Sequence, residues 1–144
     1  MVAKFFDTAP NTGEGWLKVY DLSEDTETVD LIRHASLQKA DFGFVPDVAI
    51  FGSEEWWAAI RDGRIKQHTL EGTISRVLMA GHGDWPEVEV QSAHEVTRWT
   101  RVGNQGAYVV GKPIRIEYVH ERPKRAMQSG PVKQVLAIWI KSGS

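Results

Sequence analysis

The fold prediction depends most on one segment, YVVGKPIRIEYV, residues 108–119. Gly111 marks a tight turn, and after Pro113 isoleucines alternate with charged side chains. Because successive side chains of a strand point to opposite faces, this alternation predicts a strand with one inward and one solvated face. A turn followed by such a strand suits a small closed barrel of the oligonucleotide/oligosaccharide-binding (OB) type. It suits an open antiparallel sheet covered by helices nearly as well.

Outward from this stretch, other segments alternate in the same way, and clusters of glycine, proline and asparagine separate them. The predicted strands are residues 73–79, 87–91, 95–101, 114–120 and 135–140. We therefore predict an α+β fold whose C-terminal half forms a five-stranded antiparallel sheet that is curved or barrel-like (OB-like). One or two short helices from the N-terminal half pack on this sheet.

The strongest local signal in the N-terminal half is GSEEWWAAIRDG, residues 52–63. Ser53 is a residue type that caps helices, and the two glutamates after it favour the positive end of the helix dipole. Gly63 supplies a left-handed exit. The stretch therefore predicts a helix of about two turns, with its two tryptophans in the core.

A second helix is predicted over residues 24–38, with Ser23 as its cap. Its apolar stripe would consist of Leu31, Ile32 and Ala35, with Val29 at the margin. A strand through residues 28–33 is the competing interpretation, because periodicity barely separates the two.

The length of 144 residues falls within the range of a single domain. A domain of this size needs no disulfide or metal to hold its core together. We predict one domain over residues 1–144, in which an α/β segment, 1–63, packs on a β-rich, barrel-like segment, 64–141.

The composition excludes several functional classes. The chain has no cysteine, so it has no disulfide, no thiolate nucleophile and no Cys-ligated metal site. No apolar stretch reaches the roughly 18 residues of a membrane helix, and no apolar run follows a basic start. We therefore expect no membrane span and no cleaved secretory signal, and we predict a cytoplasmic location.

Familiar catalytic motifs are missing from the sequence, including the Gly-x-Ser-x-Gly elbow, the phosphate-binding glycine loop and the His-Glu-x-x-His helix. The turn around His82 and Asp84 brings together an imidazole and a carboxylate, which both ligate divalent metals. Glycines beside polar residues are, however, expected in any hairpin turn. The sequence favours a protein without catalysis or cofactor, and leaves a small metal-assisted enzyme using His82 and Asp84 as an alternative.

Aromatic and basic residues gather in the C-terminal half. On a strand, Arg98 and Thr100 would share one face, and Trp99 and Arg101 the other. Aromatic rings flanked by cations can stack on nucleic-acid bases, and they can also contact an acidic protein surface. The predicted contact surface consists of Trp85, Arg98, Trp99, Arg101, Arg115, Arg122, Lys124 and Arg125.

The charge of the chain is uneven. Residues 87–144 carry nine basic and five acidic side chains, whereas residues 1–86 carry eight basic and fourteen acidic ones. The net charge of −2 gives little long-range attraction for polyanions. We therefore predict a small, soluble, non-catalytic module that binds a protein partner through its basic-aromatic face. Single-stranded nucleic-acid binding by an OB-like barrel is the alternative.

Three points about burial and pairing follow from the pattern. Trp139 stands in an almost wholly apolar segment and is predicted to be core. Trp99 and Tyr118 fit the core and the surface equally well, because large aromatic residues often lie at edges. If the strands 73–79 or 135–140 lie at a sheet edge, they would favour pairing with another chain, which leaves a homodimer open.

Overall fold

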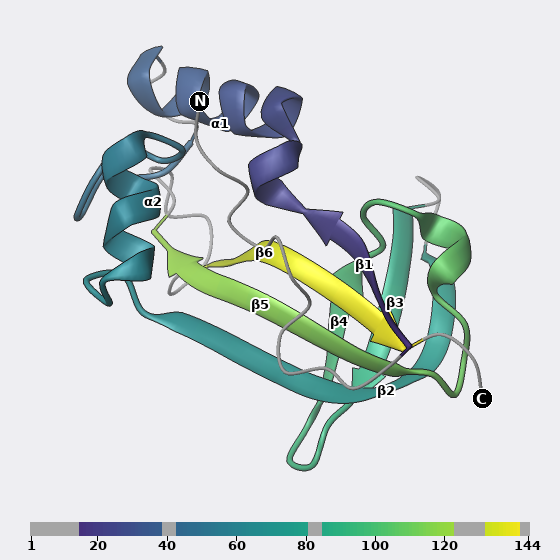
Figure 1. The fold of residues 1–144 in the computed structure, drawn as a ribbon. Helices are drawn as coiled ribbons and strands as arrows, with labels where there is room; N and C mark the ends of the chain where they lie inside the picture. Colours follow the sequence, from purple (N-terminus) through teal and green to yellow (C-terminus); the bar gives the residue numbers. More distant parts are fainter. Residues whose placement is uncertain (1–14, 39–42, 81–84, 123–131, 142–144) are drawn as a thin grey trace. The chain divides into compact units, whose positions relative to one another are not determined.

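The computed structural model describes residues 15–38, 43–80, 85–122 and 132–141 (Figure 1). Within these ranges the fold is α+β, as predicted, and contains strands, two α-helices and two short 3₁₀ helices. In chain order the elements are β1 (Trp16–Asp21), η1 (Leu22–Glu24), α1 (Thr26–Gln38), α2 (Glu54–Arg61), β2 (Gln67–Ala80), β3 (Trp85–Gln91), β4 (Val96–Thr100), η2 (Gln105–Ala107), β5 (Pro113–Glu121) and β6 (Val132–Lys141). None of the described helices is long and apolar enough to cross a membrane.

The strands form one antiparallel sheet in the order β1-β6-β5-β2-β3-β4. The predicted count of five is one too low, because β1 also joins the sheet and places Leu17 opposite Ile140 of β6. The described sheet has two edges, β1 and β4, so the predicted barrel-like, OB-like closure is not shown. A closed barrel would require these two edge strands to pair with each other, and the strand order shows no such pairing.

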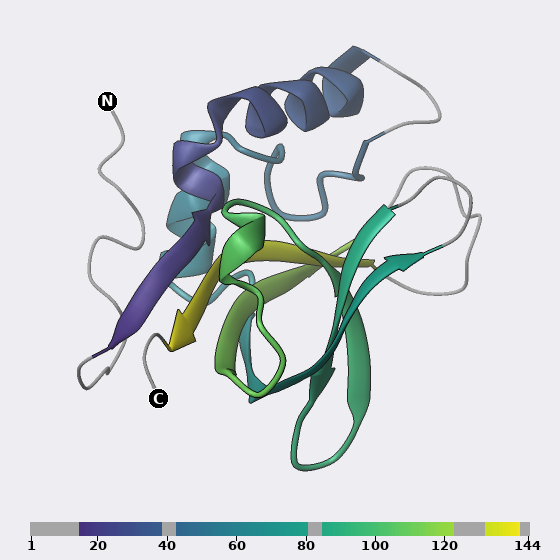
Figure 2. The same ribbon diagram turned by 90° about the vertical axis from the view of Figure 1, so that its right-hand side faces the viewer.

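Strands β2, β3 and β4 form consecutive antiparallel pairs, and β3 and β4 make a hairpin (Figure 2). Strand β2 begins at Gln67, earlier than the predicted residue 73. A Cβ atom on Gly72 would lie 2.5 Å from the carbonyl oxygen of Gln91, so glycine is what allows β3 to approach. The register then shifts at a bulge between Ile74 and Arg76.

The helix predicted over residues 24–38 is confirmed as α1, and the strand alternative is wrong. Its cap is Asp25 rather than Ser23: the Asp25 Oδ1 atom accepts a hydrogen bond from the backbone N–H of Thr28 at 3.2 Å. Because η1 occupies the residues before Asp25, the α-helix begins later than the sequence suggests.

The predicted apolar stripe of α1 is wrong at Leu31, which is 69% exposed, whereas Val29 at its margin is buried. Two glycines of the following segment explain this orientation, because they allow its backbone to lie close to α1. A Cβ on Gly52 would lie 2.5 Å from Val29 Cγ1, and a Cβ on Gly43 would lie 2.5 Å from the Ser36 hydroxyl oxygen. The side of α1 that carries Val29 and Ser36 is therefore the packed one.

Helix α2 forms as predicted. The Ser53 hydroxyl oxygen accepts a hydrogen bond from the backbone N–H of Trp56 at 3.1 Å, and Gly63 adopts a φ of 88° after the helix. Both tryptophans are buried, and the ring of Trp56 lies 4.5 Å from that of Phe51 and 4.8 Å from that of Trp57. These contacts confirm the prediction that the α2 tryptophans are core residues.

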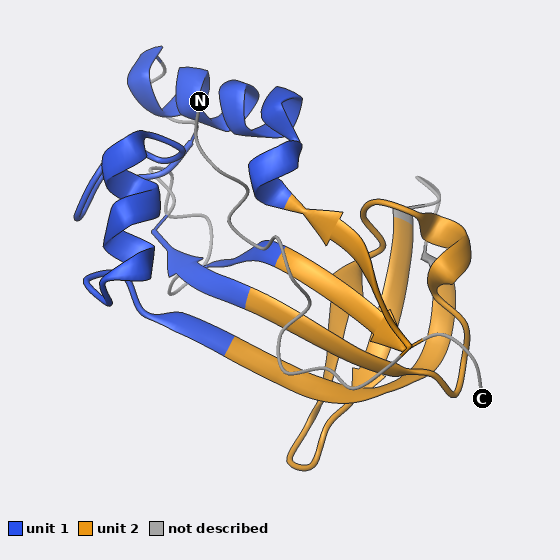
Figure 3. Cartoon of the chain, in the orientation of Figure 1, with its two compact units in different colours: residues 1–5, 22–68, 118–136 blue, residues 6–21, 69–117, 137–144 orange. Residues whose placement is uncertain are grey.

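The chain divides into two compact units (Figure 3). Unit 1 comprises residues 1–5, 22–68 and 118–136, and unit 2 comprises residues 6–21, 69–117 and 137–144. Unit 1 contains the aromatic cluster around α2. Unit 2 contains Trp139, which is fully buried as predicted. The single domain over 1–144, with segment 1–63 packed on segment 64–141, stays a prediction.

Candidate interaction surface

The alternation predicted along β4 is present, and it places Trp99 in the core. Arg98 is exposed, whereas Trp99 is only 6% exposed and lies opposite the buried Val88 of β3. The indole Nε1 of Trp99 donates a hydrogen bond to the hydroxyl of Thr97 at 2.8 Å. Trp99 therefore packs inside unit 2, which answers the question that the sequence left open.

Arg101, just after β4, is also buried, with 9% of its surface exposed. Its Nε donates to the carbonyl oxygen of Glu87 at 3.1 Å, and its Nη2 to that of Leu78 at 3.2 Å. The guanidinium therefore connects the end of β4 to the backbones of β3 and β2. Trp99 and Arg101 stay predictions as contact residues, and the surface proposed below does not depend on them.

The other described arginines of the predicted surface form ion pairs with carboxylates. The pairs are Arg98 with Glu87 at 3.9 Å, Arg115 with Glu117 at 2.9 Å and with Glu71 at 3.3 Å, and Arg122 with Asp47 at 2.5 Å. The hydrogen bond from Arg122 lowers the pKa of Asp47, so this pair keeps both charges. Arg98 and Arg115 with their partners thus give the sheet surface of unit 2 a mixed charge, and Arg122 forms its pair within unit 1.

Two of the described predicted contact residues lie on strands that are not neighbours in the sheet. Arg98 lies on β4 and Arg115 on β5, and β2 and β3 separate these strands in the sheet. At about 4.8 Å per strand, their backbones are about 14 Å apart. Arg122 belongs to unit 1, whereas Arg98 and Arg115 belong to unit 2.

Several predicted residues lie outside the described part of the chain. Trp85 opens β3 opposite Ala80, but its side chain is not described. Lys124 and Arg125 of the basic loop lie outside it, as do His82 and Asp84 of the metal hypothesis. Among the residues that are described, no three His, Asp or Glu side chains stand close enough together to hold a metal ion.

Unit 1 contains an aromatic–basic cluster at residues that the sequence did not bring together. The ring of His68 on β2 lies 5.3 Å from that of Tyr118 and 4.6 Å from that of His120, both on β5. The Lys133 Nζ lies 5.8 Å from the Tyr118 ring centre. Burial, and next the electrostatic interaction with the His120 side chain, lower the pKa of His68. Tyr118 is half-buried, and only the neighbouring positions of β2, β5 and β6 in the sheet reveal this cluster.

A buried carboxyl group lies at the end of β5 in unit 1. Glu121 is 9% exposed, and its Oε2 accepts a hydrogen bond from the indole Nε1 of Trp56 at 3.3 Å. Burial raises the pKa of Glu121 to about 7; the Trp56 hydrogen bond opposes this shift and the charge of Asp47 adds to it. The group can therefore gain or lose a proton near neutrality.

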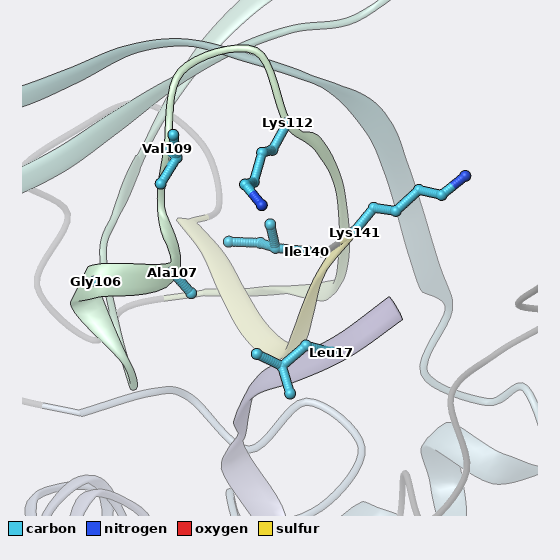
Figure 4. Close-up of a pocket in the computed structure, with 7 residues that line it drawn as sticks. All are labelled: Leu17, Gly106, Ala107, Val109, Lys112, Ile140 and Lys141. Atoms are coloured by element: carbon cyan, nitrogen blue, oxygen red, sulfur yellow. The ribbon is translucent and has the colours of Figure 1, made fainter. Parts of the chain in front are cut away.

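Exposed apolar side chains border a pocket in unit 2 (Figure 4). The pocket has a volume of about 120 Å³ and is lined from three separate segments: β1, the η2 region and the end of β6. Leu17 and Val109 are 47% and 45% exposed at its rim, and Ile140 is a buried residue of its lining. Gly106, Ala107, Lys112 and Lys141 complete the lining. The sequence offered no signal for this pocket, because its three segments are distant from one another along the chain.

Comparison with known families shows what kind of protein carries these features. A family model described as "Immunity protein RhsI2" matches residues 17–140, which run from β1 to the end of β6. The chain belongs to the RhsI2 immunity protein family. No curated protein matches the chain.

Membership of the RhsI2 immunity protein family supports the predicted protein-binding class. It gives no support to single-stranded nucleic-acid binding, to a metal-assisted enzyme or to a homodimer. The ion pairs of Arg98, Arg115 and Arg122 agree with this outcome, because a polyanion would have to compete with the carboxylates that these arginines already contact.

Proposed function

We propose that the chain is an immunity protein that binds a protein toxin and blocks its action without catalysing a reaction. The family match over residues 17–140 is the observation that carries this proposal. An immunity protein that works by occupying its toxin needs a complementary surface and no reactive group of its own. The mixed-charge sheet surface and the apolar-rimmed pocket supply such a surface.

The pocket face of unit 2 is the part of the surface that we assign to the toxin. A stable protein interface takes about 800 Å² from each partner, so the contact must extend well beyond one pocket. Single exposed apolar residues are common, and Leu31 on α1 is one of them. Leu17 and Val109 are stronger candidates for contact residues, because they come from separate segments and border the same pocket.

The predicted basic residues are a smaller part of the proposed contact surface. Arg98 and Arg122 are exposed despite their ion pairs, so they can contribute at the edge of a contact, where charges mainly affect the association rate. Trp85, Lys124 and Arg125 remain proposed contact residues on the strength of the sequence alone. A cytoplasmic site of action is also part of the proposal, because a cysteine-free chain fits a reducing compartment.

A survival assay tests this function. A candidate protein toxin is expressed in bacteria from an inducible promoter, with and without the chain, and colonies are counted. We expect the chain to restore survival, and to do so only when its level matches that of the toxin. The same toxin with its catalytic residue replaced controls for the burden of expression. Killing that is undiminished by abundant, folded chain would contradict the proposal.

A further inference from the structure

The pocket of unit 2 has a floor and walls that suit one aliphatic side chain. Leu17, Val109 and Ile140 provide branched apolar groups from β1, the loop after η2 and β6. Figure 4 shows Lys112 with its ammonium nitrogen directed over Ile140, whereas Lys141 extends away from the pocket. The interior is therefore apolar with a single cationic group pointing into it.

The loop that forms one wall is fixed at its far end by a turn. The backbone N–H of Lys112 donates to the carbonyl oxygen of Val109 at 3.2 Å, and Gly111 adopts a φ of 96°, which favours glycine. Two hydrogen bonds hold this turn against β2: Gly111 N–H to the Ile74 carbonyl at 2.8 Å, and Ile74 N–H to the Lys112 carbonyl at 3.0 Å. The position of Lys112 is thus set by backbone contacts.

The same loop is fixed at its near end by close packing. A Cβ on Gly103 would lie 2.1 Å from the carbonyl oxygen of Val19 on β1, so the backbones approach there as only glycine permits. The buried Tyr108 donates its hydroxyl hydrogen bond to the Val102 carbonyl at 2.7 Å. With both ends held, the wall is formed before a ligand arrives, which lowers the ordering cost of binding.

The charges around the pocket point to an acidic ligand. Lys112 and Lys141 form no ion pair with any carboxylate of the described ranges, although the basic residues of the sheet surface, such as Arg76, Arg98 and Arg115, do. No acidic side chain lines the pocket in that part of the chain. An ammonium over an apolar floor gains most from a carboxylate that approaches together with an apolar group, because the apolar contact excludes water from the ion pair.

We infer that this pocket receives an aliphatic side chain of the toxin that is flanked by carboxylates, with Lys112 pairing with one of them. This inference rests on the proposed function, since it names the chemistry of the toxin segment at the surface assigned above. The occupant is a segment of the partner protein rather than a second copy of this chain.

Three capped tripeptides test the chemistry of the pocket on the full-length ¹⁵N-labelled chain. They carry a leucine between two glutamates, a leucine between two lysines, and a glycine between two glutamates. We expect saturable amide shifts at Gly106, Ala107 and Ile140 with the first peptide alone, at a Kd on the order of 1 mM or weaker, as suits so small a ligand. Equal shifts with all three peptides, or none with the first, would overturn the inference. Shifts that instead follow the concentration of the chain would reveal self-association and would overturn it too.

A pair of matched variants then connects the pocket to the toxin. Lys112→Met removes the charge and keeps the apolar stem, and Lys66→Met does the same to an exposed lysine of unit 1. We expect Lys112→Met to weaken binding of the acidic leucine peptide and of the toxin by about tenfold, and Lys66→Met to change neither. Toxin that binds Lys112→Met as tightly as the wild type overturns the inference and leaves the proposed function standing. Toxin that does not bind the wild type at all contradicts the proposed function itself.

Discussion

Two buried glutamates of β5, Glu117 and Glu121, have different surroundings. Glu117 accepts hydrogen bonds from the Thr69 hydroxyl at 2.5 Å and from the Arg115 guanidinium at 2.9 Å. Glu121 contacts the indole N–H of Trp56, a neutral and weaker donor. A carboxyl group buried beside a neutral donor favours its protonated form. Protonation of Glu121 therefore makes the stability of unit 1 depend on pH.

Glu121→Gln tests this role. The folded-state pKa of about 7 lies above the usual 4.5, so the stability that protonation of Glu121 provides is complete below about pH 4.5 and is lost as the pH rises through 7. The amide of the variant does not titrate and can still accept the Trp56 hydrogen bond. We expect the variant to match the wild type at about pH 4 and to exceed its free energy of unfolding by about 1–3 kcal/mol at about pH 8. Urea denaturation at the two pH values measures this.

Glu95→Gln, at an exposed position in the β3–β4 turn, is the control for Glu121→Gln. It should leave the difference between the two pH values unchanged. A Glu121→Gln variant that is less stable than the wild type at about pH 8 would show that Glu121 is charged and well paired in the folded protein.

Trp56 is a large, fully buried residue of the unit 1 core. It is 1% exposed and contacts the rings of Phe51 and Trp57. Trp56→Ala should lower the free energy of unfolding by about 3–5 kcal/mol, because it leaves a large cavity that its aromatic neighbours cannot fill. Leu37 on α1 is 53% exposed, so Leu37→Ala should change the free energy of unfolding by less than about 0.5 kcal/mol. Equal losses in the two variants, measured by urea denaturation, would mean that Trp56 is not packed as described.

At the scale of the element, helix α1 shows how neighbours decide which face of a helix is buried. Val29 packs at Gly52, and the hydroxyl of Ser36 accepts a hydrogen bond from the Phe44 N–H at 3.0 Å. We expect Val29→Ala to cost about 1–3 kcal/mol and Leu31→Ala less than about 0.5 kcal/mol. A larger loss for Leu31→Ala would restore the apolar stripe expected from the sequence. Thermal or urea unfolding of the two variants in parallel measures the difference.

The periodic elements were predictable from the sequence, and their edges and packing were not. Alternation located the five C-terminal strands, and capping chemistry located α2, because both signals are local. Strand β1 alternates only weakly, and its membership depends on pairing with β6 at the other end of the chain. The exposure of Leu31 was not predictable for a similar reason, since Gly52 and Gly43, which lie close to Val29 and Ser36, are outside the helix.

At the scale of the whole molecule, the candidate surface was only partly within reach of the sequence. The alternation predicted for Arg98 and Trp99 was correct. Alternation alone does not show which face of a strand is buried, and in the structure the buried face carries Trp99. The basic residues were visible, but Glu71, which pairs with Arg115, and Asp47, which pairs with Arg122, come from distant segments. The pocket between Leu17 and Val109 exists only once β1 and the loop after η2 meet, so no local pattern announces it.

The family assignment supports a protein-binding module, and under the proposed function the chain acts by contact with a toxin. Its mixed surface charge gives little attraction for nucleic acid, and its apolar-rimmed pocket offers an anchor for a protein segment. The proposed binding without catalysis has a quantitative consequence, because each molecule of the chain would then block only one molecule of toxin.

Titration of a fixed amount of purified toxin domain with the chain is the direct test of binding without catalysis. The residual toxin activity is measured after each addition. The proposed function predicts a linear fall in toxin activity that reaches its end point at one molecule of chain per molecule of toxin, as tight binding without turnover requires. Activity that stays constant throughout the titration, or that disappears at a small fraction of one equivalent, would contradict it.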